Sequence, residues 1–182
     1  MSNPVSNPVS NPVSNKVSPV GKNAKKIGLI SDTHGLLRPE ALRALQGSDL
    51  VIHAGDVGKP EILDALNALA PVTAVSGNIE QGEKAPAWAL ALPETAIVEA
   101  GQVSIYILHD LHRLDLDPRA AGFHIVVSGH SHKPLRRLSD GILYLNPGSA
   151  GPQRFQLPIT VARLDLGVTP WTVEFIDLAP TL

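Results

Sequence analysis

Side chains that could bind metal ions occur at five places along the chain, and each place directly follows a run of apolar residues. In chain order they are Asp32 with His34, Asp56, Asn78, His109, and His130 with His132. Carboxylate, amide and imidazole groups are ligands that divalent metals accept in proteins. Cysteine is absent, so thiolate sites and cysteine nucleophiles are excluded. The sequence therefore favours a metal site of oxygen and imidazole ligands.

Any one of these motifs alone has a simpler explanation than metal binding. Aspartate and asparagine are common in the turns after strands, and His130 with His132 could be two solvated loop residues. All five motifs at strand ends are harder to explain in this way. Ligands of open α/β sheets gather at the carboxyl ends of the strands, which lie along one edge. The five places are therefore expected to meet in space.

The apolar runs that precede the motifs indicate the fold class. From Lys26 onward, short runs rich in β-branched residues alternate with helical patterns, which is typical of parallel βαβ units. Helices are expected to begin at Pro39 and Pro60, because proline favours the first turn of a helix. Strands are expected at 27–30, 50–54, 72–75, 96–98, 103–108, 125–127, 143–145, 159–166 and 171–176. So many strands predict an α/β fold of two packed β-sheets flanked by helices.

The first 25 residues differ in composition from the rest of the chain. They repeat Ser-Asn-Pro-Val almost without change, and the spaced prolines oppose both helix and sheet. We predict a flexible low-complexity tail over 1–25 and one domain over 26–182. The tail lacks the apolar stretch of a secretory signal, so a cytoplasmic location is expected.

Composition excludes several classes of function. The formal net charge is −2, whereas a protein that binds duplex nucleic acid is expected to be basic. Aromatic residues make up 4% of the chain, few for stacking on single-stranded nucleic acid. No apolar run approaches the roughly 20 residues of a membrane span. A small-molecule partner is expected, and the oligomeric state is left open.

The ordered motifs resemble those of the calcineurin-like metallophosphoesterases, in particular their small single-domain prokaryotic phosphodiesterases. The resemblance extends from Ile27 to about Leu178 and includes the runs 146–149 and 151–155. It implies a four-layer sandwich that holds two divalent metal ions. The implied ligands of one ion are Asp32, His34, Asp56 and His132, and those of the other are Asp56, Asn78, His109 and His130. Manganese is the metal we expect, while iron, nickel, cobalt and zinc also suit such ligands.

The resemblance implies a phosphoesterase, and more readily a phosphodiesterase than a monoesterase. A hydroxide shared by the two ions would attack phosphorus, and no further catalytic side chain is expected. Arg154 and Ser149 are candidate substrate-binding residues. His53, on an apolar strand, is expected to be a hydrogen-bonded core residue.

Two positions depart from the family pattern. Many members of the superfamily have a histidine after the asparagine, where it protonates the leaving group, and this chain has Ile79. Asp110 follows His109, where the family usually has glycine. Without the histidine, the rate is expected to depend steeply on the pKa of the leaving group.

Two other functions stay open. The retromer subunit for vacuolar sorting shares the family's fold and acts through protein contacts, so a scaffold with little or no catalysis is the alternative. A protein that stores metal or senses nucleotides would keep the ligands without hydrolysing anything. The complete ligand set favours the enzyme.

Overall fold

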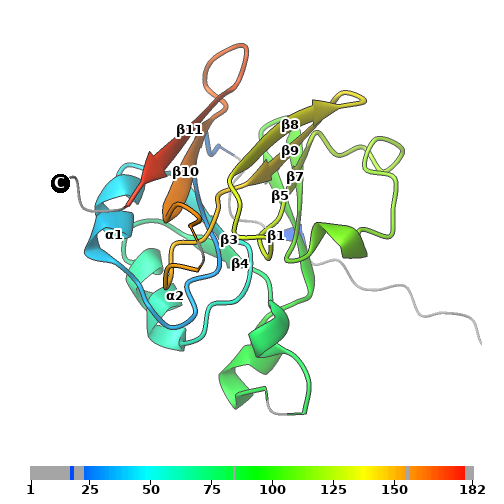
Figure 1. Cartoon of the computed structure of the whole chain (residues 1–182). Coiled ribbons are helices and arrows are strands. Elements are labelled where there is room, and N and C mark those ends of the chain that lie inside the picture. The colour runs from blue at the N-terminus through cyan, green and yellow to red at the C-terminus, as the bar shows by residue number, and fades with distance from the viewer. Residues whose placement is uncertain (1–16, 19–22, 84, 155, 179–182) are drawn as a thin grey trace, which may run out of the picture.

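The computed structural model describes residues 17–18, 23–83, 85–154 and 156–178. Two β-sheets pack face to face (Figure 1). The first has six strands in the order β1-β5-β6-β7-β9-β8, and the second has five in the order β11-β10-β2-β3-β4. The predicted class, an α/β sandwich of two sheets, is confirmed.

Each sheet combines parallel and antiparallel strand pairs. In the five-stranded sheet, β2 (Lys26–Ile30), β3 (Leu50–His53) and β4 (Val72–Ala74) are parallel. In the six-stranded sheet, β6 (Val103–Leu108), β7 (Ile125–Val127) and β9 (Ile142–Asn146) are parallel. The antiparallel neighbours are β5 (Thr95–Ala100), β8 (Leu135–Ser139), β10 (Thr160–Asp165) and β11 (Thr172–Asp177).

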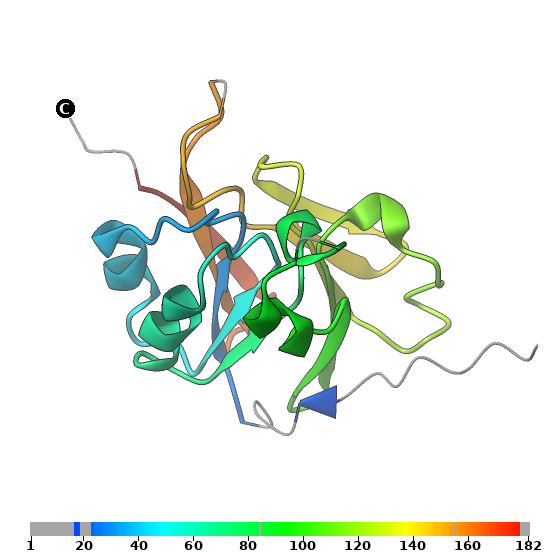
Figure 2. The same ribbon diagram turned by 90° about the horizontal axis from the view of Figure 1, so that it is seen from below.

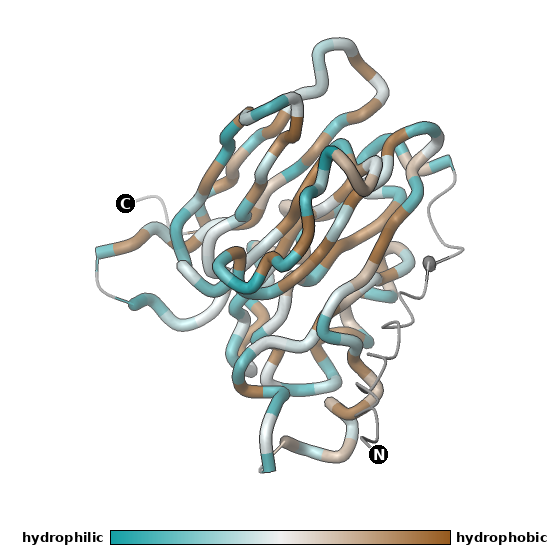
Figure 3. The backbone as a smooth tube through the Cα atoms, turned by 90° about the vertical axis from the view of Figure 1, so that its right-hand side faces the viewer, coloured by the Kyte–Doolittle hydropathy of each residue, from teal (hydrophilic) through white to brown (hydrophobic). Residues whose placement is uncertain are grey.

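The main core lies between the sheets. It contains apolar side chains of both sheets, among them Leu29, Ile52, Ile105, Val127 and Leu145, each at most 1% exposed. Figure 3 shows the most hydrophobic segments running along the strands, with hydrophilic residues in the connecting loops. Burial on both faces explains why the central parallel strands read as continuous apolar runs.

Helices α1 (Pro39–Leu45) and α2 (Pro60–Asn67) cover the outer face of the five-stranded sheet. Seen from below, both lie on the side of that sheet away from the six-stranded sheet (Figure 2). The outer face of the six-stranded sheet is covered by the loop that contains the short 3₁₀ helix η3 (Leu111–Arg113). Two other 3₁₀ helices, η1 (Asn78–Glu80) and η2 (Ala87–Ala91), follow β4.

The sequence analysis missed two strands. Strand β8 is an edge strand with Arg136, Arg137 and Leu138 exposed, so it lacks the apolar signature of a buried strand. Strand β1 (Val17–Ser18) pairs in parallel with β5, within the predicted flexible tail. The flexible tail over 1–25 stays a prediction, and two of its residues pair with β5. They lie in a proline-free stretch, 13–18, whose backbone can pair with the free edge of β5. The rest of 1–22 lies outside the described residues.

Candidate metal centre

The five predicted ligand motifs meet at the carboxyl ends of β2, β3, β4, β6 and β7. Asp32 and His34 follow β2, Asp56 follows β3, and Asn78 begins η1 after β4. His109 directly follows β6, and the loop after β7 carries His130 and His132. Parallel strands direct their carboxyl ends to one edge, and here both sheets contribute to the same cluster.

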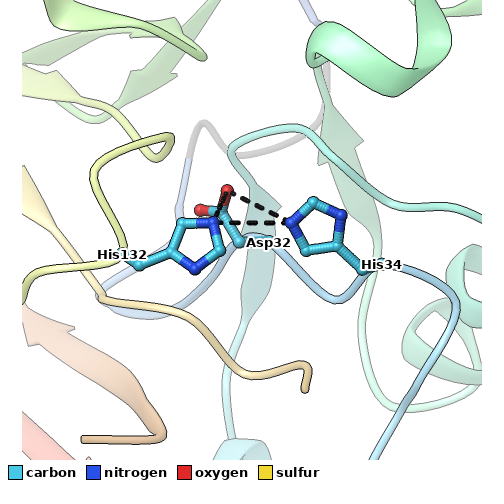
Figure 4. Close-up of side chains that lie close together, drawn as sticks. All are labelled: Asp32, His34 and His132. Carbon is cyan, nitrogen blue, oxygen red and sulfur yellow. Dashed lines mark hydrogen bonds and ion pairs between the residues drawn. The ribbon is translucent and has the colours of Figure 1, made fainter. Parts of the chain in front are cut away.

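Asp32, His34 and His132 form one part of the cluster, with both rings directed at the carboxylate (Figure 4). The Nε2 atoms of His34 and His132 lie 3.4 Å apart. Asp32 Oδ1 is 3.1 Å from Nε2 of His132 and 3.9 Å from Nε2 of His34. Three ligand atoms thus face one point from two distant segments of the chain.

Asp56 connects this group to the other ligands. Its Oδ2 lies 3.6 Å from His34 Nε2 and 3.4 Å from His109 Nε2. Asp32, Asp56 and His109 form a second group of potential ligands with all three residues buried. The Asp56 carboxylate therefore lies between the two halves of the cluster.

Asn78 and His130 complete the side of the cluster around His109. Asn78 Nδ2 is 3.3 Å from His130 Nδ1, and the ring centroids of His109 and His130 are 5.3 Å apart. This side of the cluster is open to solvent, because Asn78 is exposed and the His130 side chain is 38% exposed. The structure thus brings all seven predicted ligands into one cluster.

The buried atoms of this cluster fit a metal site. Asp32 Oδ2 accepts hydrogen bonds from the Ser31 hydroxyl (2.6 Å) and the His130 backbone N–H (3.1 Å). Its Oδ1 is buried, and no group of the described residues donates a hydrogen bond to it. His109 Nδ1 is 2.7 Å from the Ala54 carbonyl oxygen, to which it donates. The other ring nitrogen of His109, Nε2, therefore carries a lone pair that is directed into the cluster. Nε2 is also buried, and it has no hydrogen bond within the described part of the chain.

The backbone of the site is unusual. Among the described residues, six that are not glycine have a positive φ, and five of them are predicted ligands. These five are Asp32, His34, Asp56, His130 and His132, with φ between 47° and 65°. Such conformations are uncommon for non-glycine residues and cluster at functional sites, where the surrounding structure holds them. Nothing in the sequence pattern had indicated this feature.

Two glycines leave room for the ligands to approach. A Cβ atom on Gly77 would overlap the backbone nitrogen and carboxylate of Asp56, and one on Gly55 would lie 2.6 Å from His109 Nδ1. The glycines of Gly55-Asp56 and Gly77-Asn78 are thus required by close packing of the ligand loops.

The protonation states of Asp56 and His34 suit metal binding, whereas His109 would have to lose any proton on Nε2 when an ion binds. Burial would raise the pKa of Asp56, but the interaction with His109 and the N–H of Ile79 outweigh it and lower the pKa to about 2. Burial lowers the pKa of His34 from its ordinary value. For His109, burial would lower the pKa, but the nearby Asp56 carboxylate outweighs it and raises the pKa. At neutral pH the structure therefore holds an ionised Asp56 and a neutral His34, which are the forms that bind metal.

The sequence analysis missed side chains that hold the ligand loops. His53 is fully buried; its Nε2 is 3.0 Å from the Thr33 hydroxyl, and its Nδ1 accepts the Gly55 N–H. The predicted core role of His53 is confirmed, and the residue also joins the loops after β2 and β3. Glu80 is 3% exposed and accepts the N–H groups of Gly58 and Gly77. It joins the loops after β3 and β4.

The two predicted substrate residues differ in position. The Ser149 hydroxyl is buried and donates to the Asp32 carbonyl oxygen at 3.0 Å, so it positions that ligand. Substrate contact by Ser149 stays a prediction that this hydrogen bond does not support. Arg154 is exposed, and its charge acts on His34 strongly enough to contribute to the lowered pKa. Contact between Arg154 and an anionic substrate stays a prediction.

The fold and the cluster together define a two-sheet α/β protein with a carboxylate- and histidine-rich centre at the strand ends. Comparison with known proteins gives the family. Residues 26–168 match the model of the calcineurin-like phosphoesterase superfamily domain, and the chain belongs to this superfamily. The resemblance noted from the motifs is confirmed.

Curated relatives carry related names. A probable metallophosphoesterase of Methanothermobacter thermautotrophicus is 36% identical over 76% of this chain and 86% of its own length. One of Bacillus subtilis is 32% identical over 83% of this chain and 90% of its own length. A phosphodiesterase of Methanocaldococcus jannaschii is 31% identical over 68% of this chain and 82% of its own length.

Solved structures of both catalytic and sorting proteins share the fold. An archaeal phosphodiesterase superposes with a TM-score of 0.67 at 24% identity, covering 83% of this chain and 99% of its own. The vacuolar protein sorting 29 protein of Chaetomium thermophilum superposes with a TM-score of 0.66 at 18% identity, covering 84% and 97%. At 24% and 18% identity, these similarities establish the shared fold and no shared activity. Within the described part of the chain, no helix is long and apolar enough to cross a membrane.

Proposed function

We propose that this protein is a dinuclear metal-dependent phosphoesterase, and that it acts on phosphodiesters in preference to monoesters. One observation carries the proposal. The seven residues that the family pattern assigns as ligands converge in one cluster, where buried atoms Asp32 Oδ1 and His109 Nε2 have no hydrogen-bond partner. Buried polar atoms normally have hydrogen-bond partners, so two unpaired atoms among these ligands support a role in binding a metal ion.

The residues fit two ions. Asp32, His34, Asp56 and His132 would hold one, and Asp56, Asn78, His109 and His130 would hold the other. Asp56 lies between the two groups, with Oδ2 within 3.6 Å of histidines on either side. When bound, two divalent ions would generate a nucleophile from water and neutralise charge on the phosphate. Manganese is the metal we propose; iron, nickel, cobalt and zinc suit the same ligands.

The chain's own residues would prepare the site for this chemistry. Asp32 and Asp56 carry two negative charges, which leave a dinuclear centre net positive and able to attract an anionic ester. Hydrogen bonds from Ser31, the His130 N–H and the Ile79 N–H hold both carboxylates in one orientation. Preorganised ligands of this kind lose little entropy on binding.

A preference for diesters is supported by the phosphodiesterase among the relatives, and the position after Asn78 supports a requirement for good leaving groups. Ile79 is 42% exposed beside the cluster, and its N–H donates to Asp56 Oδ1. It places an alkyl group where a leaving-group acid stands in many relatives. A site without such an acid is better suited to esters whose leaving groups depart without a proton.

The alternative is a protein-binding scaffold, since sorting proteins share the fold. Metal analysis combined with turnover separates the two. Purified protein is loaded with Mn²⁺, dialysed, and assayed on bis-p-nitrophenyl phosphate and p-nitrophenyl phosphate. Two ions per chain and faster diester hydrolysis would support the proposal. Metal-loaded protein that hydrolyses neither would favour the scaffold. A cytoplasmic location stays a prediction.

A further inference from the structure

A hollow of about 230 Å³ opens beside the half of the cluster that contains Asn78 and His109. These two residues form part of its wall. Tyr106, Leu108 and Leu116 line it with apolar surface, and Gln81 adds an amide. Its size and mixed lining suit a small organic group joined to a phosphate at the metal centre.

The charges around this hollow are mostly negative. Glu94, Asp110 and Asp115 line it against one guanidinium, that of Arg113. Arg113 already interacts with Gln81 Oε1 at 3.2 Å and with Glu94 at 3.9 Å. Glu94 therefore offsets the guanidinium charge. Asp110 lies 3.0 Å from His112 Nδ1 and 3.9 Å from His130 Nε2, and Asp115 adds a carboxylate for which the described residues provide no such partner.

The opposite side of the cluster is basic. Arg154 acts on His34, the side chain of Lys59 lies beside Gly35, and Arg38 donates to the Gly151 carbonyl oxygen at 3.3 Å. An electrostatic gradient thus crosses the site, from these cations to the carboxylates of the hollow. Such a gradient orients a substrate with charged ends.

We propose that the hollow binds one organic group of the ester, and that its carboxylates select a cationic group over a neutral one and exclude an anionic one. The substrate class is therefore a phosphodiester of an ammonium-bearing or uncharged alcohol, in contrast to a diester whose alcohol carries its own phosphate or carboxylate. This inference rests on the proposed function, because it places the phosphate at the metal centre.

A series of three p-nitrophenyl diesters tests the charge preference at nearly constant shape. The second ester group is choline, its uncharged carbon isostere 3,3-dimethylbutyl, or 3-carboxypropyl. Rates are measured at pH 8, above the titration range of an ordinary histidine. A single exposed charge about 5 Å from a substrate charge changes binding roughly fourfold in water. We expect kcat/KM to fall about threefold to fivefold at each step from cationic to neutral to anionic.

Two variants shift this preference in opposite directions. Asp115→Asn removes one carboxylate from the lining of the hollow, so the choline-to-dimethylbutyl ratio should fall about threefold. Arg113→Gln leaves Glu94 uncompensated, so the same ratio should rise about threefold. Asp140→Asn is the matched control, because Asp140 lies in the turn between β8 and β9, at the end of these strands away from the site. It should leave the ratio unchanged.

Binding provides a readout that does not depend on turnover. Isothermal titration of Mn²⁺-loaded protein compares phosphorylcholine with 3,3-dimethylbutyl phosphate, and inorganic phosphate reports on the metal centre itself. Phosphorylcholine should bind more tightly, and Asp115→Asn should reduce that difference while leaving the Kd of inorganic phosphate unchanged. Equal affinities in the wild type, or ratios that none of the variants alters, would overturn the proposal. Binding of inorganic phosphate without hydrolysis of any diester would instead overturn the proposed function and leave the charge preference measurable.

Discussion

His109 Nε2 lies 3.4 Å from Asp56 Oδ2, although the two residues are 53 positions apart in the chain. The two residues follow strands of different sheets, β6 and β3, so their approach joins the sheets at the candidate centre. Nδ1 of the same ring donates to Ala54, which fixes the tautomer. The ring can therefore offer a lone pair beside a carboxylate that is shared by both halves of the cluster.

Replacement of Asp56 by asparagine tests the shared carboxylate. The change removes one negative charge from between the two groups of ligands while keeping the shape of the side chain. We expect fewer than two ions per chain by elemental analysis and a loss of diesterase activity of at least about 10²-fold. Asp64→Asn, on the exposed face of α2, should change neither quantity. Normal metal content and turnover in the Asp56 variant would contradict the dinuclear assignment.

A leaving-group series tests the absence of an acid at Ile79. The wild-type rate should fall steeply from aryl to alkyl diesters, because no side chain at this position donates a proton. Ile79→His should raise the rate on alkyl esters by up to about 10²-fold and affect aryl esters little. Ile79→Gln is the control, because it adds polarity without an acid. A wild-type rate that does not depend on leaving-group pKa, with chemistry limiting, would show that another group already donates the proton.

The pH dependence of folding tests the buried state of His53. Burial lowers its pKa from 6.5 to about 4. Between these values the unfolded state binds more protons than the folded state, so stability is full above about pH 6.5 and falls as the pH drops. From pH 7.5 to pH 5 the contribution of this residue should fall by about 2 kcal/mol.

Urea denaturation of metal-free protein at both pH values, for wild type and His53→Gln, measures this contribution. The loss between the two pH values should be smaller in the variant. NMR titration of the His53 ring provides a second measurement on the wild type. A ring that takes up its proton near pH 6.5 in the folded protein would contradict the prediction.

Truncation of the tail tests the contribution of β1. Deletion of residues 2–20 removes the two residues that pair with β5, whereas deletion of 2–15 keeps them. We expect the longer deletion to lower the unfolding free energy by about 1 kcal/mol, the scale of one or two backbone hydrogen bonds, and the shorter one to leave it unchanged. Neither should alter kcat/KM, because β1 lies at the edge of its sheet and is separated by β5 from β6, the strand that His109 follows. Loss of activity on either deletion would show that the tail contributes to the site.

The order of elements could be read from the sequence because local rules set it. Prolines mark the starts of α1 and α2, and uninterrupted apolar runs mark the parallel strands, which are buried on both faces. Edge strands β1 and β8 were missed for the converse reason. Their pairing depends on which backbone edge lies beside them, and no residue pattern within either segment records that neighbour.

The sequence also determined the identity and order of the candidate ligands, because residue type and position after a strand are local properties. The seven ligands are Asp32, His34, Asp56, Asn78, His109, His130 and His132. Only the tertiary structure decided how these groups face one another. The left-handed backbone at Asp32 and Asp56, the tautomer of His109 and the buried contacts of Glu80 arise from loops that approach across two sheets. The acidic hollow beside His109 has the same origin. Charges from separate loops act together there only because folding brings them within a few ångströms, where electrostatic energies become significant.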